Sequence, residues 1–144
     1  MGTSMLRPLS LSTLFSVAMA ASAVAADLLL VVGGTGRTGW PTVQEALAAG
    51  YDVRATTTSV QRAKERYGED GFEWVEMDAR ILDEVRSAMD GVDYVISTIG
   101  GSCFDTGGPS SARYVDYQGV VNMAGVALDK GVKHFVLTSA LSAG

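Results

Sequence analysis

The junction between an apolar run and a glycine cluster constrains the fold more than any other feature of the chain. Residues 28–32 read Leu-Leu-Leu-Val-Val, and Gly-Gly-Thr-Gly-Arg-Thr-Gly follows directly at 33–39. Residues 34–39 fit the spacing G-x-G-x-x-G, and residues 33–39 also fit G-x-x-G-x-x-G. Glycines here allow positive φ and let a pyrophosphate approach backbone amides at a helix N-terminus. A tight structural turn is the alternative, but a buried strand before the glycines and a helical pattern after them favour dinucleotide binding.

The first 26 residues differ from the remainder of the chain. They contain Arg7 but no acidic residue, and the stretch 9–26 is rich in apolar and small residues. Ala-Val-Ala at 23–25 fits an A-x-A cleavage site. This pattern predicts a cleavable targeting segment at 1–26, followed by a single domain at 27–144. Delivery to an organelle such as a plastid and secretion both stay open, and no stable membrane span is expected after cleavage.

Composition excludes several classes of function. A hydrophobic content of 47% with 19% charged residues is typical of a globular domain. The formal net charge of −5 argues against a nucleic-acid surface, which needs a basic face. Cys103 is the only cysteine, so no intrachain disulfide and no C-x-x-C pair can form. We therefore expect no structural metal site.

Apolar runs alternate with amphipathic stretches along the rest of the chain. We expect strands at 28–32, 51–57, 72–77, 92–98 and 133–138. We expect helices at 37–49, 59–67, 82–89 and 110–130, the second of them N-capped by Ser59. This alternation predicts βαβ units in an α/β, Rossmann-like, doubly wound parallel sheet of strand order 3-2-1-4-5. The ligand crevice should lie where the order reverses, between strands one and four.

Several motifs carry a resemblance to a known family. They are the glycine motif at 33–39, Asp78, Gly-Val-Asp-Tyr-Val-Ile at 91–96 and Gly-Val-Lys-His-Phe-Val-Leu-Thr-Ser at 131–139. In this order they resemble the atypical, NmrA-like NAD(P)-binding short-chain dehydrogenase/reductases over residues 27–144. The Thr-Ser-Ala at 138–140 is similar, more loosely, to the biliverdin-IXβ/flavin reductase group.

The resemblance implies positions for the parts of a dinucleotide. The phosphates would lie on the glycine loop, formed by Gly33, Gly34, Thr35, Gly36, Arg37, Thr38 and Gly39. Adenine would lie near Asp78 and Ala79, nicotinamide near Thr98, Ile99 and Gly100, and the reacting edge near Thr138 and Ser139. Asp78 could instead be a solvated or helix-starting carboxylate. Ser139 is a weak catalytic candidate, because a serine that closes a strand often bonds only to its own backbone.

The end of the second strand bears on the choice of cofactor. NAD sites usually have a carboxylate here for the ribose 2′-hydroxyl, but no acidic residue lies between Val53 and Ala63. Guanidinium and hydroxyl groups suit a 2′-phosphate. This stretch offers Arg54, Thr56, Thr57, Thr58, Ser59 and Arg62, and Arg37 lies inside the glycine loop. The sequence therefore favours NADP over NAD. Related reductases often carry arginine at the position of Thr58.

The catalytic pair of the resembled family is missing. Short-chain dehydrogenases that reduce carbonyls generally use Tyr-x-x-x-Lys, and none of the five tyrosines has a lysine four residues later. The leading hypothesis is an NADP-dependent oxidoreductase that passes hydride directly to an unidentified small-molecule acceptor such as a flavin, quinone or tetrapyrrole. The alternative is a non-catalytic NADP redox sensor. An S-adenosylmethionine-dependent methyltransferase is disfavoured, since such sites also need an acid after the second strand.

The sequence ends shortly after the fifth expected strand. We expect a Rossmann domain truncated at its C-terminus, with the fifth strand left at an open edge of the sheet. Such an edge favours pairing with another chain. The hypotheses are therefore self-association through this edge or an inactive fragment of a longer reductase.

Overall fold

The computed structural model describes residues 26–101, 107–108 and 111–139. Residues 1–25 of the predicted targeting segment lie outside them. The elements, in chain order, are β1 (Leu28–Val32), α1 (Gly39–Ala48), β2 (Asp52–Thr57), α2 (Val60–Tyr67), β3 (Glu73–Glu76), α3 (Leu82–Ala88), β4 (Tyr94–Ser97), η1 (Arg113–Gly119), α4 (Val120–Asp129) and β5 (His134–Leu137).

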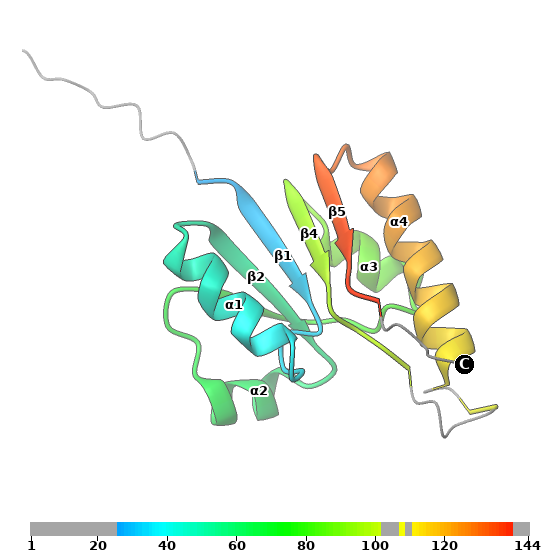
Figure 1. Ribbon diagram of the computed structural model, residues 1–144, viewed down its shortest axis with the longest axis horizontal. Coiled ribbons are helices and arrows are strands. Elements are labelled where there is room, and N and C mark those ends of the chain that lie inside the picture. Colours follow the sequence, from blue (N-terminus) through cyan, green and yellow to red (C-terminus); the bar gives the residue numbers. More distant parts are fainter. Residues whose placement is uncertain (1–25, 102–106, 109–110, 140–144) are drawn as a thin grey trace, which may run out of the picture.

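The five strands form one parallel sheet in the order β3-β2-β1-β4-β5, which confirms the predicted Rossmann-like topology. Leu30 in the central strand is level with Arg54 of β2 and Val95 of β4. The strand arrows point toward a common edge (Figure 1), where the loops after β1, β2 and β4 gather. The carboxyl ends of the strands therefore provide the crevice at which such folds bind ligands.

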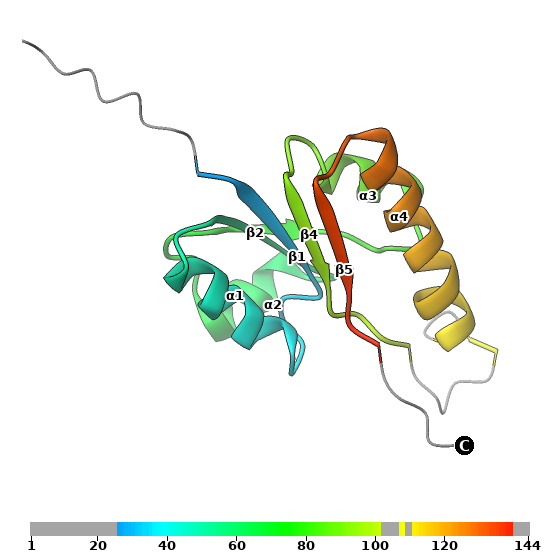
Figure 2. The ribbon, with the colours of Figure 1, turned by 45° about the horizontal axis from the view of Figure 1, so that its top comes forward.

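Helices cover both faces of the sheet and give three layers (Figure 2). On one face, the side chain of Val31 packs in a cluster with residues of α1 and α2, including Val43 and Ala63. On the other, Leu30 packs in a cluster with residues of α3 and α4, including Val85 and Met123. Because both faces of β1 are covered, its sequence is a continuous apolar run and shows no alternation of polar and apolar residues.

The long fourth helix differs in detail from the prediction of a helix at 110–130. Its first part, η1, is a π-helix, and only Val120–Asp129 winds as an α-helix. Hydrophobic periodicity cannot detect this change of winding, since the apolar pattern across seven residues is too short to separate the two periods. Gly119 ends the π-helical part against Ala79, where an added Cβ would lie 3.1 Å from the Cβ of Ala79.

Ser59 differs from its predicted role as well. It is the N-cap residue of α2, but its side chain makes no capping hydrogen bond. Instead the Glu76 carboxylate, from the end of β3, lies 3.5 Å from the N–H of Val60. A neighbouring strand thus provides the acceptor that local sequence was expected to provide.

No helix among the described residues is long and apolar enough to cross a membrane. The described residues also contain no group of three His, Cys, Asp or Glu side chains able to hold a metal ion.

Candidate functional site

The glycine loop between β1 and α1 is shaped by close packing. Gly33 has φ of +81°, the only positive φ within residues 33–39. A Cβ on Gly39 would lie 2.0 Å from the carbonyl oxygen of Gly33, and one on Gly34 would lie 2.9 Å from the Cβ of Ala55. The expectation of positive φ therefore holds for Gly33, while Gly34 and Gly39 are required by contact with neighbouring backbone and side chains.

Hydrogen bonds from three neighbouring elements hold this loop. The N–H of Gly33 donates to Thr56 Oγ1 at 3.1 Å, and the N–H of Gly34 donates to the Thr56 carbonyl at 2.9 Å. The hydroxyl of Thr98 donates to the Val32 carbonyl at 2.8 Å. From α2, the Tyr67 hydroxyl donates to the Thr35 carbonyl at 3.1 Å. The loop is thus fixed in position without any ligand.

Four backbone amides of the loop have no acceptor among the described residues: those of Thr35, Arg37, Thr38 and Gly39. Thr38 is the N-cap residue of α1, and its side chain makes no capping bond. Unpaired N–H groups and the positive end of the helix dipole favour an anion at this point. The arrangement is suited to a diphosphate.

A first cavity of about 310 Å³ opens beside the loop at the carboxyl ends of β1, β2 and β3. Its walls are apolar at Val32, Met77, Ala79, Ile99 and Val115, and polar at Gly33, Thr35, Thr56, Thr57, Thr58, Asp78 and Arg80. A mainly apolar cavity with a few convergent polar groups fits a flat heterocycle with hydrogen-bonding edges.

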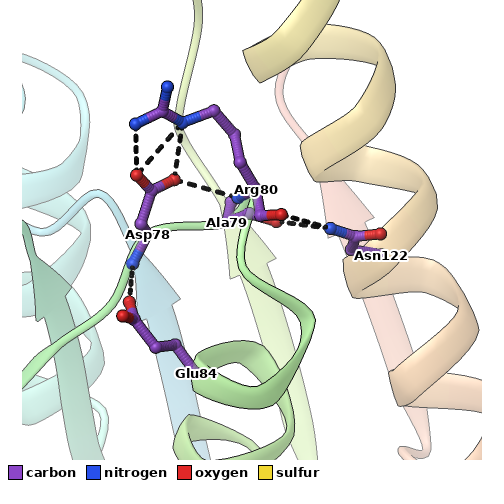
Figure 3. A network of polar contacts seen from close by, with 5 residues as sticks. All are labelled: Asp78, Ala79, Arg80, Glu84 and Asn122. Carbon is purple, nitrogen blue, oxygen red and sulfur yellow. Dashed lines mark hydrogen bonds and ion pairs between the residues drawn. The ribbon is translucent and has the colours of Figure 1, made fainter. Parts of the chain in front are cut away.

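The turn after β3 forms one wall of this cavity. Figure 3 shows the polar contacts of this turn. The Asp78 carboxylate binds the guanidinium of Arg80 and accepts the N–H of Arg80 at 2.9 Å. The hydrogen bond from the Arg80 side chain holds the pKa of Asp78 below its usual value. The N–H of Asp78 donates to Glu84 at 2.7 Å, and Asn122 of α4 donates to the carbonyls of Ala79 and Arg80. The turn is therefore held from two helices.

A second cavity of about 270 Å³ lies between the loop and α2. It is lined by Thr35, Thr57, Thr58, Ser59, Arg62, Ala63, Arg66 and Tyr67. Arg62 and Arg66 are one helical turn apart, so they lie on the same face of α2. No carboxylate lines this cavity. Its charge and hydroxyl groups suit a phosphate monoester.

A third cavity of about 680 Å³ lies at the ends of β4 and β5. It is lined by Thr98, Ile99, Gly100, Gly101, Ala112, Asp116, Val120, Leu137, Thr138 and Ser139. Asp116 is the single ionisable side chain among these lining residues, and it accepts the N–H of Gly101. This part of the site contains no tyrosine, lysine or histidine among its described lining residues.

Most of the predicted site residues come together at this edge of the sheet, but Arg54 does not. Its guanidinium binds Glu73 at 2.7 Å and the carbonyls of Ala88 and Asp90 at 2.9 Å. These partners lie at the start of β3 and the end of α3, and Arg54 lines none of the three cavities. Its position early in β2, not at the carboxyl end, is the reason. Arg37 is exposed on the loop and also lines none of them.

The structure adds three residues that the sequence analysis did not select: Arg66, Tyr67 and Asn122. Arg66 follows Arg62 by four residues, and this helical spacing could have identified it. The other two act through hydrogen bonds to backbone atoms of distant segments, so no local sequence pattern marks them.

Comparison with known proteins agrees with this geometry. Residues 33–144 match the family described as NAD(P)H-binding. The chain is 31% identical over 134 residues to "Protein TIC 62, chloroplastic" from Pisum sativum, covering 80% of this chain and 24% of that protein. It is 32% identical over 114 residues to "Photosystem II assembly factor Ycf39" from Trieres chinensis, covering 77% of this chain and 34% of that protein.

A solved structure, Pen from Bacillus thuringiensis, superimposes with a TM-score of 0.70 at 26% identity, covering 79% of this chain and 37% of that one. A short-chain dehydrogenase/reductase superfamily protein from Agrobacterium tumefaciens, solved with bound NAD, has the same fold with a TM-score of 0.66 at 22% identity, covering 78% of this chain and 32% of that one. The chain spans about a quarter to a third of the length of these two curated relatives. The chain belongs to the NAD(P)H-binding family.

Proposed function

We propose that this chain binds NADP(H) across the three cavities and presents the nicotinamide to a small-molecule acceptor. The observation that carries the proposal is the continuity of the cavities around the glycine loop. The first and second share Thr35, Thr57 and Thr58, and the first and third share Ile99. A dinucleotide is long enough to occupy all three at once.

Each cavity suits one part of the cofactor. The first takes the adenosine against Ala79, and the second takes the 2′-phosphate against Arg62 and Arg66. The diphosphate lies at the unpaired amides of Thr35, Arg37 and Thr38 and at the N-terminus of α1. The third takes the nicotinamide, beside Thr98 and Gly100.

NADP is preferred over NAD because of the charges around the second cavity. The two arginines would form charge-assisted hydrogen bonds to a 2′-phosphate. A ribose 2′-hydroxyl would find no carboxylate among the lining residues, although NAD sites usually provide one here.

The proposed reaction is direct hydride transfer from the nicotinamide to an electron-poor acceptor such as a flavin, quinone or tetrapyrrole. In this scheme the cofactor carries the chemistry and solvent provides the proton. The described lining of the third cavity supports it, since neither tyrosine nor lysine is present to protonate a carbonyl oxygen. Ser139 lines this cavity and is the residue we propose to contact the acceptor.

The same observation favours a second candidate, a non-catalytic NADP redox sensor. A site whose described lining contains neither tyrosine nor lysine binds the cofactor but need not turn it over. Following NADPH absorbance with flavin and quinone acceptors separates the two functions. Oxidation of NADPH supports the reductase, and tight binding without oxidation supports the sensor.

The cofactor preference is tested by calorimetry on Arg62→Ala and Arg66→Ala. We expect each substitution to weaken NADPH binding roughly 10-fold and to leave NADH binding within about 2-fold, because only NADPH carries the 2′-phosphate. Arg86→Ala, on α3 and outside the cavities, is the matched control and should change neither affinity. Equal loss for NADPH and NADH would contradict the placement of the 2′-phosphate, and S-adenosylmethionine should not bind.

We further propose that residues 1–26 direct the domain at 27–144 to an organelle. The chloroplastic relative supports a plastid destination. The test is to fuse residues 1–30 to a fluorescent protein and follow its location, with N-terminal sequencing of the mature product. Retention of the intact segment in the cytosol would contradict the proposal.

A further inference from the structure

Asn122 on α4 contacts the wall of the first cavity from outside. Its Nδ2 donates to the Ala79 carbonyl at 3.0 Å and to the Arg80 carbonyl at 3.2 Å (Figure 3). Gln118, one turn earlier, donates to Asn122 Oδ1 at 2.9 Å, on the side of the amide that faces away from the turn's carbonyls. Asn122 lines none of the three cavities. It can affect a ligand only through the turn that it holds.

This turn presents a single unpaired backbone donor. The N–H of Asp78 binds Glu84, that of Arg80 binds Asp78 Oδ1, and that of Ile81 binds the Asp78 carbonyl. The N–H of Ala79 has no acceptor among the described residues, although Ala79 is only 8% exposed and lines the first cavity. A backbone donor at the wall of a cavity can bind an acceptor on a ligand in that cavity.

The segment that carries Asn122 also forms walls of two cavities. Val115 of η1 lines the first cavity, whereas Asp116 and Val120 line the third. Gly119 packs so closely on Ala79 that no side chain fits between them without displacement. Asn122 therefore connects the turn after β3 to a helix that both halves of the crevice share.

We propose that Asn122 is a positioning residue for the cofactor: its two hydrogen bonds hold the turn at Asp78–Arg80 so that the N–H of Ala79 meets the adenine edge. This inference rests on the proposed binding of NADP(H). From α4, the side chain of Asn122 acts on the adenosine half of the cofactor through the backbone carbonyls of Ala79 and Arg80.

The test uses Asn122→Asp in the full chain. Aspartate has nearly the same shape but replaces the donor with oxygen, so it repels both carbonyls without opening a cavity. We expect Kd to rise roughly 10-fold for NADPH and by the same factor for 2′,5′-ADP, which lacks the nicotinamide. Gln118→Ala, which leaves the two donor bonds in place, is the matched control and should stay within about 2-fold.

Hydrogen exchange in the ligand-free protein provides a readout that does not depend on binding. The amides of residues 79–82 should exchange faster in Asn122→Asp, while those of Leu30 and Val31 in the central strand stay protected. Unchanged affinity for 2′,5′-ADP, or acceleration spread equally to the central strand, would overturn the positioning role. Failure of the wild-type chain to bind NADPH would instead refute the proposed function, and the exchange measurement would still decide whether Asn122 holds the turn.

Discussion

The two ends of the strand order, the side at β3, β2 and β1 and the side at β4 and β5, differ in how completely the described residues enclose them. Around β1, β2 and β3, helices α1 and α2 close a core that includes stacked rings of Trp40 and Tyr67 at 4.5 Å. At the other side β5 is an edge strand paired only with β4, and its Val136 and Leu137 are 52% and 43% exposed.

This contrast separates binding from chemistry. The side that suits the adenosine and phosphates is built from buried glycines, fixed amides and paired side chains, all within the chain. The side that would face an acceptor has an open edge and one ionisable lining residue, Asp116. The described residues therefore suit the common part of the cofactor, whereas they offer few polar groups for the choice of an acceptor.

On the enclosed side, we expect a substitution at Gly39 to cause the largest loss of stability and of NADPH binding. In Gly39→Ala the new Cβ meets the carbonyl of Gly33, a backbone atom that cannot move aside without opening the loop. We expect a loss of about 2–3 kcal/mol in the free energy of unfolding and NADPH binding too weak to measure. Urea unfolding and calorimetry provide the two values.

Gly125→Ala is the control for that substitution. Gly125 lies in α4, and an added Cβ there has no atom within 4 Å among the described residues. Alanine should stabilise the helix by about 0.5–1 kcal/mol and leave NADPH affinity unchanged. If Gly39→Ala behaved in the same way, the close packing of the loop would have no energetic significance.

On the open side, we expect a substitution to change self-association of the chain and not its affinity for the cofactor. We expect the chain to self-associate through β5, and Val136→Lys to reduce the molar mass in light scattering to that of a monomer, because a charge on an edge strand blocks pairing. Val121→Lys on α4 is the matched control, since Val121 is 50% exposed. A wild-type chain that stays monomeric at every concentration, or equal dissociation by both variants, would contradict pairing at this edge.

The sequence predicts the fold well for a physical reason. Three local signals indicate the same βαβ unit: an apolar run buried on both faces, a glycine turn and a helical pattern. Because strands and helices alternate along the whole chain, few sheet orders are possible. The confirmed order 3-2-1-4-5 follows from that consistency. The winding of η1 and the backbone acceptor role of Thr56 do not follow, because both depend on contacts between segments far apart in the chain.

The site shows the same limit in its arginines. Arg54 and Arg62 are both candidates for a 2′-phosphate by residue type. Their positions separate them, because Arg62 faces the second cavity while Arg54 binds Glu73 and the end of α3. The residue type indicates the chemistry, whereas the place of each arginine in the fold, on α2 or early in β2, decides which guanidinium reaches the crevice.

The smallest expected effect concerns the ion pair at the turn after β3. The hydrogen bond from Arg80 lowers the pKa of Asp78 from the usual 3.8, so the stability it contributes is present above pH 3.8 and is lost as the pH falls below that value. Asp78→Asn removes this titration, so the difference in Tm between wild type and variant should shrink as the pH falls from about 5 to 3. The effect at neutral pH should be small because the pair is partly exposed to solvent, which screens its charges. Asp52→Asn, which removes an exposed carboxylate that forms no ion pair among the described residues, corrects for the loss of one charge. A Tm difference that stays constant across this range would show that the pair with Arg80 does not stabilise the turn, which would then be held by Glu84 and Asn122 alone.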